Sequence, residues 1–305
     1  MPIAKPRPAP APAVPASTTL ASPAVRHGGT ASTRHRPHRI TPNLFGIAFG
    51  LAGLAEAWRA AGQVLGIPRA VPDTIDLASS LVWATLVVAY LQQGRRQVSA
   101  DLRDDVLAPF VSLAPITAML LSSALAAVAF SAGQILVAVF LVLTLLLGGW
   151  LTGHWMLGEL DQKAAHPGYF LPTVAGGLVG AFSAAQVHLE AVGEASLGIG
   201  LICWALLGSL VLNRLFFGPR LPPRLLPTMA IELAPPAVAG LAWSALRGGP
   251  AGPVAAFFGG YAVLMGLVQL RLVPLYRRLQ FTPSFWAFAF SYAAAATDAL
   301  EWIGH

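Results

Sequence analysis

The fold of this chain is decided by its last uncharged stretch, which begins FTPSFWAFAF at Phe281–Phe290 and continues to Thr297. No charged residue lies between Leu279 and Thr297, so the stretch is close to the roughly 20 residues that a helix needs to cross a bilayer. It is the last of about nine such stretches. The pattern predicts an all-α, multi-pass membrane protein.

The composition agrees with this class. Of 305 residues, 56% are hydrophobic and 10% are charged, whereas a soluble domain has roughly 25% charged residues. The single cysteine, Cys203, excludes a disulfide framework and a Cys-based zinc site. No phosphate loop, nucleophile elbow or HExxH motif is present, so we expect no enzyme, no metal and no cofactor.

Charge-free windows place the spans, with boundaries uncertain by several residues. Between the third and fourth spans, we expect the turn at Gly133, beside Ser131. The nine predicted spans are about Asn43–Trp58, Leu77–Gly94, Phe110–Val128, Gln134–Thr152, Pro167–Val187, Ser196–Asn213, Thr228–Leu246, Val254–Leu270 and Phe281–Ala299.

The basic residues orient the bundle. With the N-terminus in the cytoplasm, three Arg fall outside (Arg59, Arg69 and Arg247) and ten Lys or Arg fall inside. This bias predicts a cytoplasmic N-terminus, and we expect a bacterial cytoplasmic membrane. The ten are Arg95, Arg96, Arg103, Lys163, Arg214, Arg220, Arg224, Arg271, Arg277 and Arg278.

Residues 1–40 differ in kind from residues 41–305, the predicted transmembrane pore domain. The segment is rich in Pro and Ala, basic and free of acidic residues, so we expect a disordered cytoplasmic tail beside anionic lipid. It has no aromatic residue on which bases could stack, which argues against nucleic-acid binding.

Three odd-numbered spans carry proline followed by small residues, and the first and ninth spans match them in register. Proline in a membrane helix frees a carbonyl that must find protein or water. We therefore expect the odd helices inside, around a path, and the even helices outside, with small residues allowing close contact. The candidates for pore-lining or helix-kink positions are Ala48, Pro115, Pro172, Pro235, Pro236 and Ser291.

Ordered motifs extend this pattern into a family resemblance. They include FGI at Phe45–Ile47, PITAML at Pro115–Leu120, FLP at Phe170–Pro172, LAP at Leu233–Pro235 and WAFAF at Trp286–Phe290. This set resembles the tellurite-resistance/dicarboxylate transporter family, which includes the slow anion channels of plant guard cells.

The resemblance implies ten helices, arranged as five hairpins around a central pore in each subunit of a homotrimer. It also implies passive or weakly coupled anion transport and a pore-closing phenylalanine, which falls on Phe290. Three departures are Ala48 in place of a proline, Glu232 in place of an apolar residue, and the absence of the tenth helix. The ninth span is therefore expected to lack a hairpin partner.

A physical argument also favours a gate at Phe290, because a ring in a narrow apolar lumen excludes ions until its rotamer changes. The alternative is an ordinary packed aromatic residue. Trp286 lies one turn earlier on the same helical face, while Phe288 points elsewhere.

Glu232 is a carboxylate within a span, where such groups usually face a cavity. Its spacing from Pro235 and Pro236 predicts a shared face, hence a protonatable or selectivity site at the inner mouth. The alternative is a residue that reaches out of the membrane or pairs with Arg224.

Two groups of polar residues lie outside the spans. The first is a possible basic inner rim that would concentrate anions, although the orientation bias alone also explains it; its members are Arg220, Arg224, Arg271, Arg277 and Arg278. The second, around the fourth-to-fifth connection, fits no zinc motif and is expected to form a polar loop; its members are His154, Glu159, Asp161 and His166.

Our first functional hypothesis is a channel or uniporter for small monovalent anions, gated by Phe290. The second is a proton-coupled transporter of dicarboxylate, sulfite or tellurium oxyanions, with Glu232 taking the proton. A third, from another class, is a non-conducting structural membrane subunit.

Overall fold

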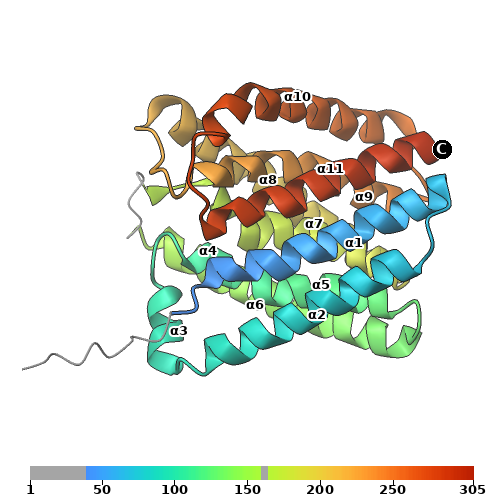
Figure 1. Ribbon diagram of the computed structural model, residues 1–305, viewed down its shortest axis with the longest axis horizontal. Helices are drawn as coiled ribbons and strands as arrows, with labels where there is room; N and C mark the ends of the chain where they lie inside the picture. The colour runs from blue at the N-terminus through green and yellow to red at the C-terminus, as the bar shows by residue number, and fades with distance from the viewer. Residues whose placement is uncertain (1–38, 159–163) are drawn as a thin grey trace, which may run out of the picture. The chain divides into compact units, whose positions relative to one another are not determined.

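The computed structural model describes residues 39–158 and 164–305, and every regular element in these ranges is a helix. The expectation for the tail falls almost entirely on residues 1–38, outside the described residues. Lys163, Glu159 and Asp161, for which the sequence also raised expectations, lie outside the described residues as well. The long helices from residue 40 onward run lengthwise beside one another (Figure 1).

Eight stretches of the described residues are long and apolar enough to cross a membrane. Four of them are single long helices: α2 (Ala70–Leu91), α6 (Phe130–Met156), α8 (Glu190–Phe217) and α10 (Gly252–Tyr276). The short helix α3 (Arg95–Asp101) lies in the connection that follows α2.

The odd-numbered spans are composite, each a short N-terminal segment followed by an α-helix. They are η1 (Pro42–Leu44) with α1 (Phe45–Leu65); α4 (Ala108–Val111) with α5 (Leu113–Leu125); η3 (Pro167–Phe170) and η4 (Leu171–Ala175) with α7 (Gly176–Gln186); η5 (Leu226–Leu233) with α9 (Ala234–Arg247); and η6 (Pro283–Phe285) with α11 (Trp286–Gly304).

α11 takes the ninth position in the bundle, but it is not one of the eight stretches. Its C-terminal half carries Asp298 and Glu301, which lower its hydropathy. The sequence therefore located nine helices correctly, while length and composition mark only eight of them as spans.

Burial separates the spans into two layers. In the first four odd spans, 61 to 78% of the apolar window is buried, against 11 to 28% in the four even helices. An even helix therefore faces lipid with most of its surface, while an odd span packs among its neighbours. The predicted arrangement, odd helices inside and even helices outside, is confirmed.

Prolines mark the start of the inner helices rather than their middles. Pro115 is the third residue of α5, and Pro235 and Pro236 are the second and third residues of α9. Pro172 is the second residue of η4, a π-helical turn. Because the first turn has no intrahelical acceptor for its N–H groups, proline costs little there.

Glycines let the inner helices approach closely. A Cβ on Gly50 would lie 2.6 Å from Cβ of Ala289, and one on Gly53 would lie 2.7 Å from Cδ2 of Phe290. α1 and α11 therefore pack side by side (Figure 1). The ring of Phe290 lies against the backbone of α1 at Gly53.

The turn between the third and fourth spans differs from the prediction. α5 ends at Leu125 and α6 begins at Phe130, so Gly133 lies inside the first turn of α6. A Cβ on Gly133 would lie 2.6 Å from Cβ of Ala126. This glycine is needed for the close approach of the two helices rather than for the turn.

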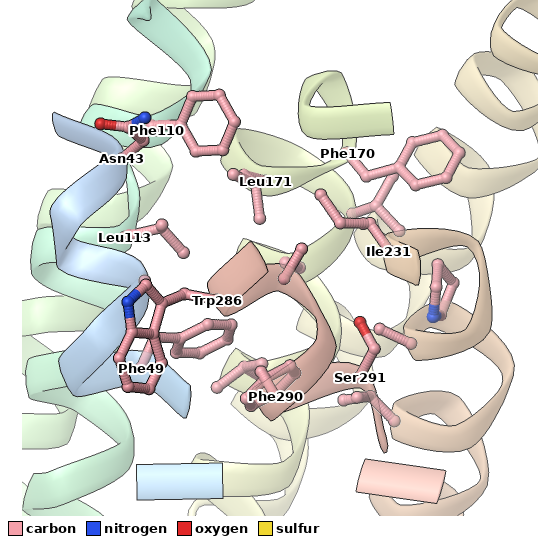
Figure 2. Close-up of a pocket in the computed structure, with 18 of the residues that line it drawn as sticks. Asn43, Phe49, Phe110, Leu113, Phe170, Leu171, Ile231, Trp286, Phe290 and Ser291 are labelled. Atoms are coloured by element: carbon pink, nitrogen blue, oxygen red, sulfur yellow. The ribbon is translucent and has the colours of Figure 1, made fainter. Parts of the chain in front are cut away.

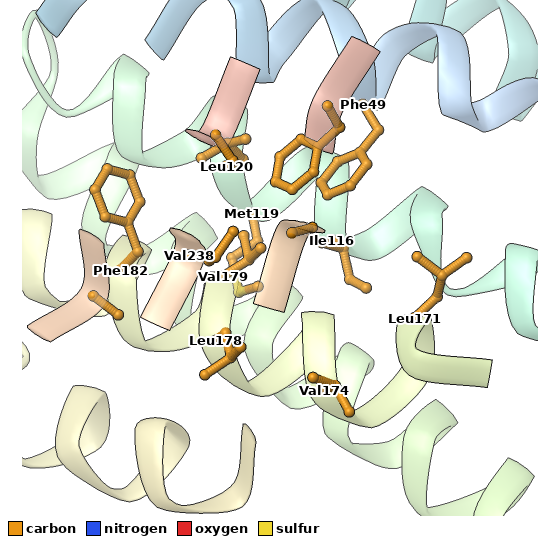
Figure 3. Close-up of a cluster of buried hydrophobic side chains, with 14 of the residues drawn as sticks. Phe49, Ile116, Met119, Leu120, Leu171, Val174, Leu178, Val179, Phe182 and Val238 are labelled. Atoms are coloured by element: carbon orange, nitrogen blue, oxygen red, sulfur yellow. The ribbon is translucent and has the colours of Figure 1, made fainter. Parts of the chain in front are cut away.

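Apolar side chains of the inner spans meet in one cluster at the middle of the bundle (Figure 3). Ile116 and Met119 of α5, Val174 of η4 and Val179 of α7 are all buried to 1% exposure or less. The centre is thus packed, and only small cavities interrupt it.

One side of α11 is not covered by another helix of the described residues. A groove of about 880 Å³ lies along it, lined largely by apolar side chains of α1, α10 and α11, including Leu54, Tyr276 and Phe288.

Candidate functional site

A cavity of about 50 Å³ lies where the inner spans converge (Figure 2). This is room for more than one water molecule. All five inner spans border it, and its lining residues are Asn43, Gly46, Phe49, Phe110, Leu113, Phe170, Leu171, Val174, Ala175, Leu178, Val179, Ile231, Ala234, Pro235, Val238, Pro283, Ser284, Trp286, Ala287, Phe290 and Ser291.

The lining of this first cavity carries no charged side chain. Its polar side chains are few, chiefly Asn43, Ser284 and Ser291. Asn43 accepts a hydrogen bond of 2.6 Å from the hydroxyl of Thr41, and the hydroxyl of Ser291 is directed towards the cavity (Figure 2). An ion in this space would meet a mostly apolar wall.

The inner α-helices present their N-terminal ends to the first cavity. Each contributes a residue from its first two turns, namely Gly46, Leu113, Leu178, Ala234 and Trp286. The N-terminus of a helix carries a partial positive charge. Five such ends would favour a negative charge in the cavity without any basic side chain.

A second cavity, of about 20 Å³, follows the first towards the C-terminal ends of the inner helices. Three residues border both cavities: Val179, Val238 and Phe290. The full lining of the second is Gly53, Glu56, Leu120, Val179, Phe182, Val238, Leu241, Phe290, Ala294 and Thr297.

Phe290 lies between the cavities as part of a ring pair. It is 8% exposed and stacks on Phe49, with 3.7 Å between ring centroids and 16° between ring planes. Trp286 lines the first cavity one turn earlier, whereas Phe288 turns away and packs edge-on against Tyr276.

Sequence reasoning missed one charged residue at this site. Glu56 borders the second cavity and forms an ion pair of 2.6 Å with Arg59, which also reaches Asp76 of α2 at 2.5 Å. A usable signal was present, because Glu56 and Arg59 are an i,i+3 pair of opposite charge near the end of an apolar stretch.

Glu232 lies away from both cavities, contrary to the prediction. It faces a groove between α8 and α10 and is 7% exposed. Ile231 and Val238 face the first cavity, and a helix turns by about 100° per residue, so Glu232 points well to one side. The change from η5 to α9 at Ala234 also shifts the phase on which the prediction relied.

Only some of the other positions predicted to line the pore border a cavity. Ser291 and Pro235 border the first cavity, whereas Pro115, Pro172 and Pro236 border neither cavity. Ala48 is fully buried and lines neither cavity; its carbonyl accepts a hydrogen bond of 2.8 Å from Ser79 of α2. These residues shape the inner spans rather than the cavity wall.

The five arginines of the predicted rim are all exposed and border neither cavity. They lie in the connection from α8 to η5, in the last turns of α10 and just after it. This is the end of the bundle at which the inner spans begin (Figure 1). The positions are Arg220, Arg224, Arg271, Arg277 and Arg278.

His166 is fully buried, although the sequence suggested a polar loop. Its Nδ1 accepts from the N–H of Gly168 at 3.0 Å, so Nε2 carries the proton and donates to the Val106 carbonyl at 3.2 Å. Burial lowers the pKa of His166 from 6.5 to about 4, although the bond to Val106 opposes this shift. The ring stacks on Phe110, which lines the first cavity.

No three His, Cys, Asp or Glu side chains in residues 39–158 and 164–305 gather closely enough to hold a metal ion. His154, from the same predicted polar loop, instead stacks on Trp150 with 5.8 Å between ring centroids.

The two layers of helices and the cavities between the inner spans define a multi-pass, all-helical membrane protein. Residues 39–304 match the voltage-dependent anion channel family, and the chain belongs to that family. It is 29% identical over 268 residues to the tellurite resistance protein TehA homolog of Haemophilus influenzae, covering 87% of this chain and 81% of that protein. The resemblance read from the motifs is thereby confirmed.

Proposed function

We propose that this protein passes small monovalent anions through its two central cavities and that Phe290 closes the path between them. The observation that carries the proposal is the place of Phe290, which borders both cavities at the centre of the five inner spans. A buried aromatic ring at such a constriction excludes water and ions until it moves.

Three features favour anions over cations at the first cavity. The inner helices direct their N-terminal ends towards it, its lining has no carboxylate, and the five exposed arginines lie at the same end of the bundle. Their field raises the local concentration of anions. Since the wall is mostly apolar, anions that lose water easily should pass best.

Opening would require the ring of Phe290 to leave its stack with Phe49. Such a pair contributes about 0.5–1.5 kcal/mol beyond the area that it buries. The ring also lies against Gly53, four residues after Phe49 on α1. These contacts support a path that is closed at rest.

The test is current through planar bilayers that contain the purified protein, in chloride and in nitrate. Phe290→Ala should raise anion conductance about ten-fold or more, as expected when about 1.4 kcal/mol or more of barrier is removed. Phe288→Ala is the matched control, because it deletes the same side chain two residues away, where it packs on Tyr276.

Equal conductance in the two variants would contradict a gate at Phe290. Absence of current in both, with the protein folded, would turn the interpretation towards a coupled carrier.

A second candidate function, a proton-coupled carrier of dicarboxylate, sulfite or tellurium oxyanions, is favoured by Glu56. The carboxylate of Glu56 borders the second cavity, whereas Glu232 lines a separate groove. The name of the H. influenzae relative refers to tellurite resistance. Uptake of tellurite into proteoliposomes that depends on an imposed pH gradient, and is lost in Glu56→Gln, would establish coupling; uptake unchanged by the gradient would exclude it.

We further propose a bacterial inner-membrane location with the N-terminus in the cytoplasm. The arginine-rich end of the bundle would then face inwards, as the positive-inside rule requires. Protease accessibility of an epitope placed before residue 39 in inverted vesicles tests this orientation, and protection in those vesicles would contradict it.

A further inference from the structure

The groove that Glu232 faces is a separate feature of the molecule. It lies between the outer helices α8 and α10, both of which contact α9, and its volume is about 420 Å³. This is within the roughly 300–1,000 Å³ that small-molecule sites occupy. The groove opens on the lipid-facing side of the bundle, apart from the two central cavities.

The carboxyl group of Glu232 has no partner there. Its Oε1 is buried and accepts no hydrogen bond, and no ion pair in the described residues involves this side chain. The hydroxyl of Ser209, which also lines the groove, is bonded to the carbonyl of Ala205 at 2.8 Å. Among the described residues of the lining, Glu232 carries the only carboxyl group, and none is basic.

Aromatic side chains line the same groove as this carboxyl group. Trp204 of α8 and Tyr261 of α10 meet edge to face, with 5.4 Å between ring centroids and 76° between planes. Phe257 and Phe258 extend the wall along α10. Gly208 contributes no side chain and leaves a niche beside Trp204.

A buried carboxylate in a groove lined by aromatic rings is the chemistry that recognises an organic cation. The rings attract positive charge through their quadrupoles, and the carboxylate supplies the counter-ion. Because ionisable residues in a membrane are costly and normally paired, a side chain without a partner marks a site whose partner is supplied from outside the chain.

We propose that the groove between α8 and α10 binds a lipophilic organic cation, an ammonium or phosphonium group with apolar substituents, with Glu232 as its counter-ion. The cation enters from the bilayer, which concentrates such molecules. The site does not rest on the anion pathway, because it shares no lining residue with either central cavity.

The experiment measures equilibrium binding of radiolabelled tetraphenylphosphonium to the purified full chain. Tetraphenylborate, an anion of nearly the same shape, is the comparison ligand. The wild type should bind the phosphonium saturably, with one site per chain, and should show no saturable binding of the borate. Glu232→Gln should weaken phosphonium binding at least about ten-fold, whereas Glu190→Gln, an exposed carboxyl group on α8, should leave it unchanged.

A second variant covers the case in which Glu232→Gln fails to fold. Gly208→Leu adds a side chain to the niche and leaves the carboxyl group of Glu232 in the chain; the nearest atoms to a Cβ there belong to Trp204, at 3.4 Å and 3.6 Å. It should also weaken binding about ten-fold. Unchanged phosphonium binding in either folded variant, or equal saturable binding of the borate by the wild type, would overturn the proposal.

Discussion

Glu56 lies beside the second cavity, and it shares one guanidinium group with a second carboxylate. Arg59 pairs with Glu56 on its own helix and with Asp76 on α2, so the three side chains have a formal net charge of −1 beside the second cavity. On the proposed path, an anion that passes Phe290 would meet this charge next. We therefore expect Glu56 to influence how anions leave the proposed path.

Glu56→Gln should increase anion conductance, because it removes a negative charge beside the path and leaves Arg59 less neutralised. Measured in the Phe290→Ala background, we expect a gain of roughly three- to ten-fold, reduced at high salt. Glu190→Gln serves as control, since its side chain is 64% exposed and borders neither cavity. A conductance that falls or stays constant would show that Glu56 does not oppose anions.

His166 makes the fold sensitive to acid. Its pKa is about 4 in the folded protein and near 6.5 in the unfolded chain. The unfolded chain thus binds more protons between these values, and stability falls as the pH drops through this window. The full effect is on the order of 3 kcal/mol.

The prediction for His166 is a difference between two melting curves. Between pH 7 and pH 5 the wild type should lose more thermal stability than His166→Gln, which cannot titrate but keeps an amide for the bonds to Gly168 and Val106. Melting in detergent at both pH values measures this. Parallel losses would assign the acid sensitivity to other groups.

At the scale of elements, the inner spans depend on changes of helix type. The π turn η4 fits against α6 at Gly148, where a Cβ would lie 2.8 Å from the carbonyl oxygen of Pro172. The neighbouring Gly149 has open space around its Cα. Two adjacent glycines on one helix therefore have opposite constraints.

Gly148→Ala should destabilise the protein by about 1–3 kcal/mol, because a backbone carbonyl must shift to admit the methyl group. Gly149→Ala should be neutral or stabilising by up to about 1 kcal/mol, since alanine is the better helix former. Thermal unfolding of both variants in detergent provides the comparison. Similar stability of the two would mean that η4 is not held against α6.

At the scale of the whole molecule, the outer layer of the described residues is incomplete beside α11. The apolar groove there has a volume of about 880 Å³, with Phe281 and Tyr292 among its exposed side chains. Such a surface in a membrane is covered by lipid or by another helix.

We expect a homotrimer with one path per subunit, as the family resemblance implies. Native mass spectrometry of the detergent-solubilised protein should give three times the mass of the 31.9 kDa chain. A monomeric mass at working concentrations would contradict this assembly.

Much of the fold followed from local sequence. The spans were predicted to within a few residues for most helices, because a charge-free stretch of sufficient length is enough to specify a membrane helix. The proline pattern separated inner from outer helices, and WAFAF placed Phe290 on the inner face with Trp286. These inferences need only helical periodicity within one segment.

The tertiary structure decided the positions that depend on contacts between segments. Glu232 faces an outer groove, because the helix phase changes where η5 meets α9. Glu56 faces the second cavity, because no such change separates it from Gly53 on α1. His166 became buried by stacking on Phe110, which lies 56 residues earlier.

The sequence by itself determined that this chain crosses the membrane many times, and which segments do so, because the cost of inserting each residue is a local sum. Only the tertiary structure decided which face of each inner span meets the centre and which carboxyl group lies beside the path. The reason is physical: side-chain direction depends on how 3₁₀, π and α turns are joined, and packing between helices fixes those joints.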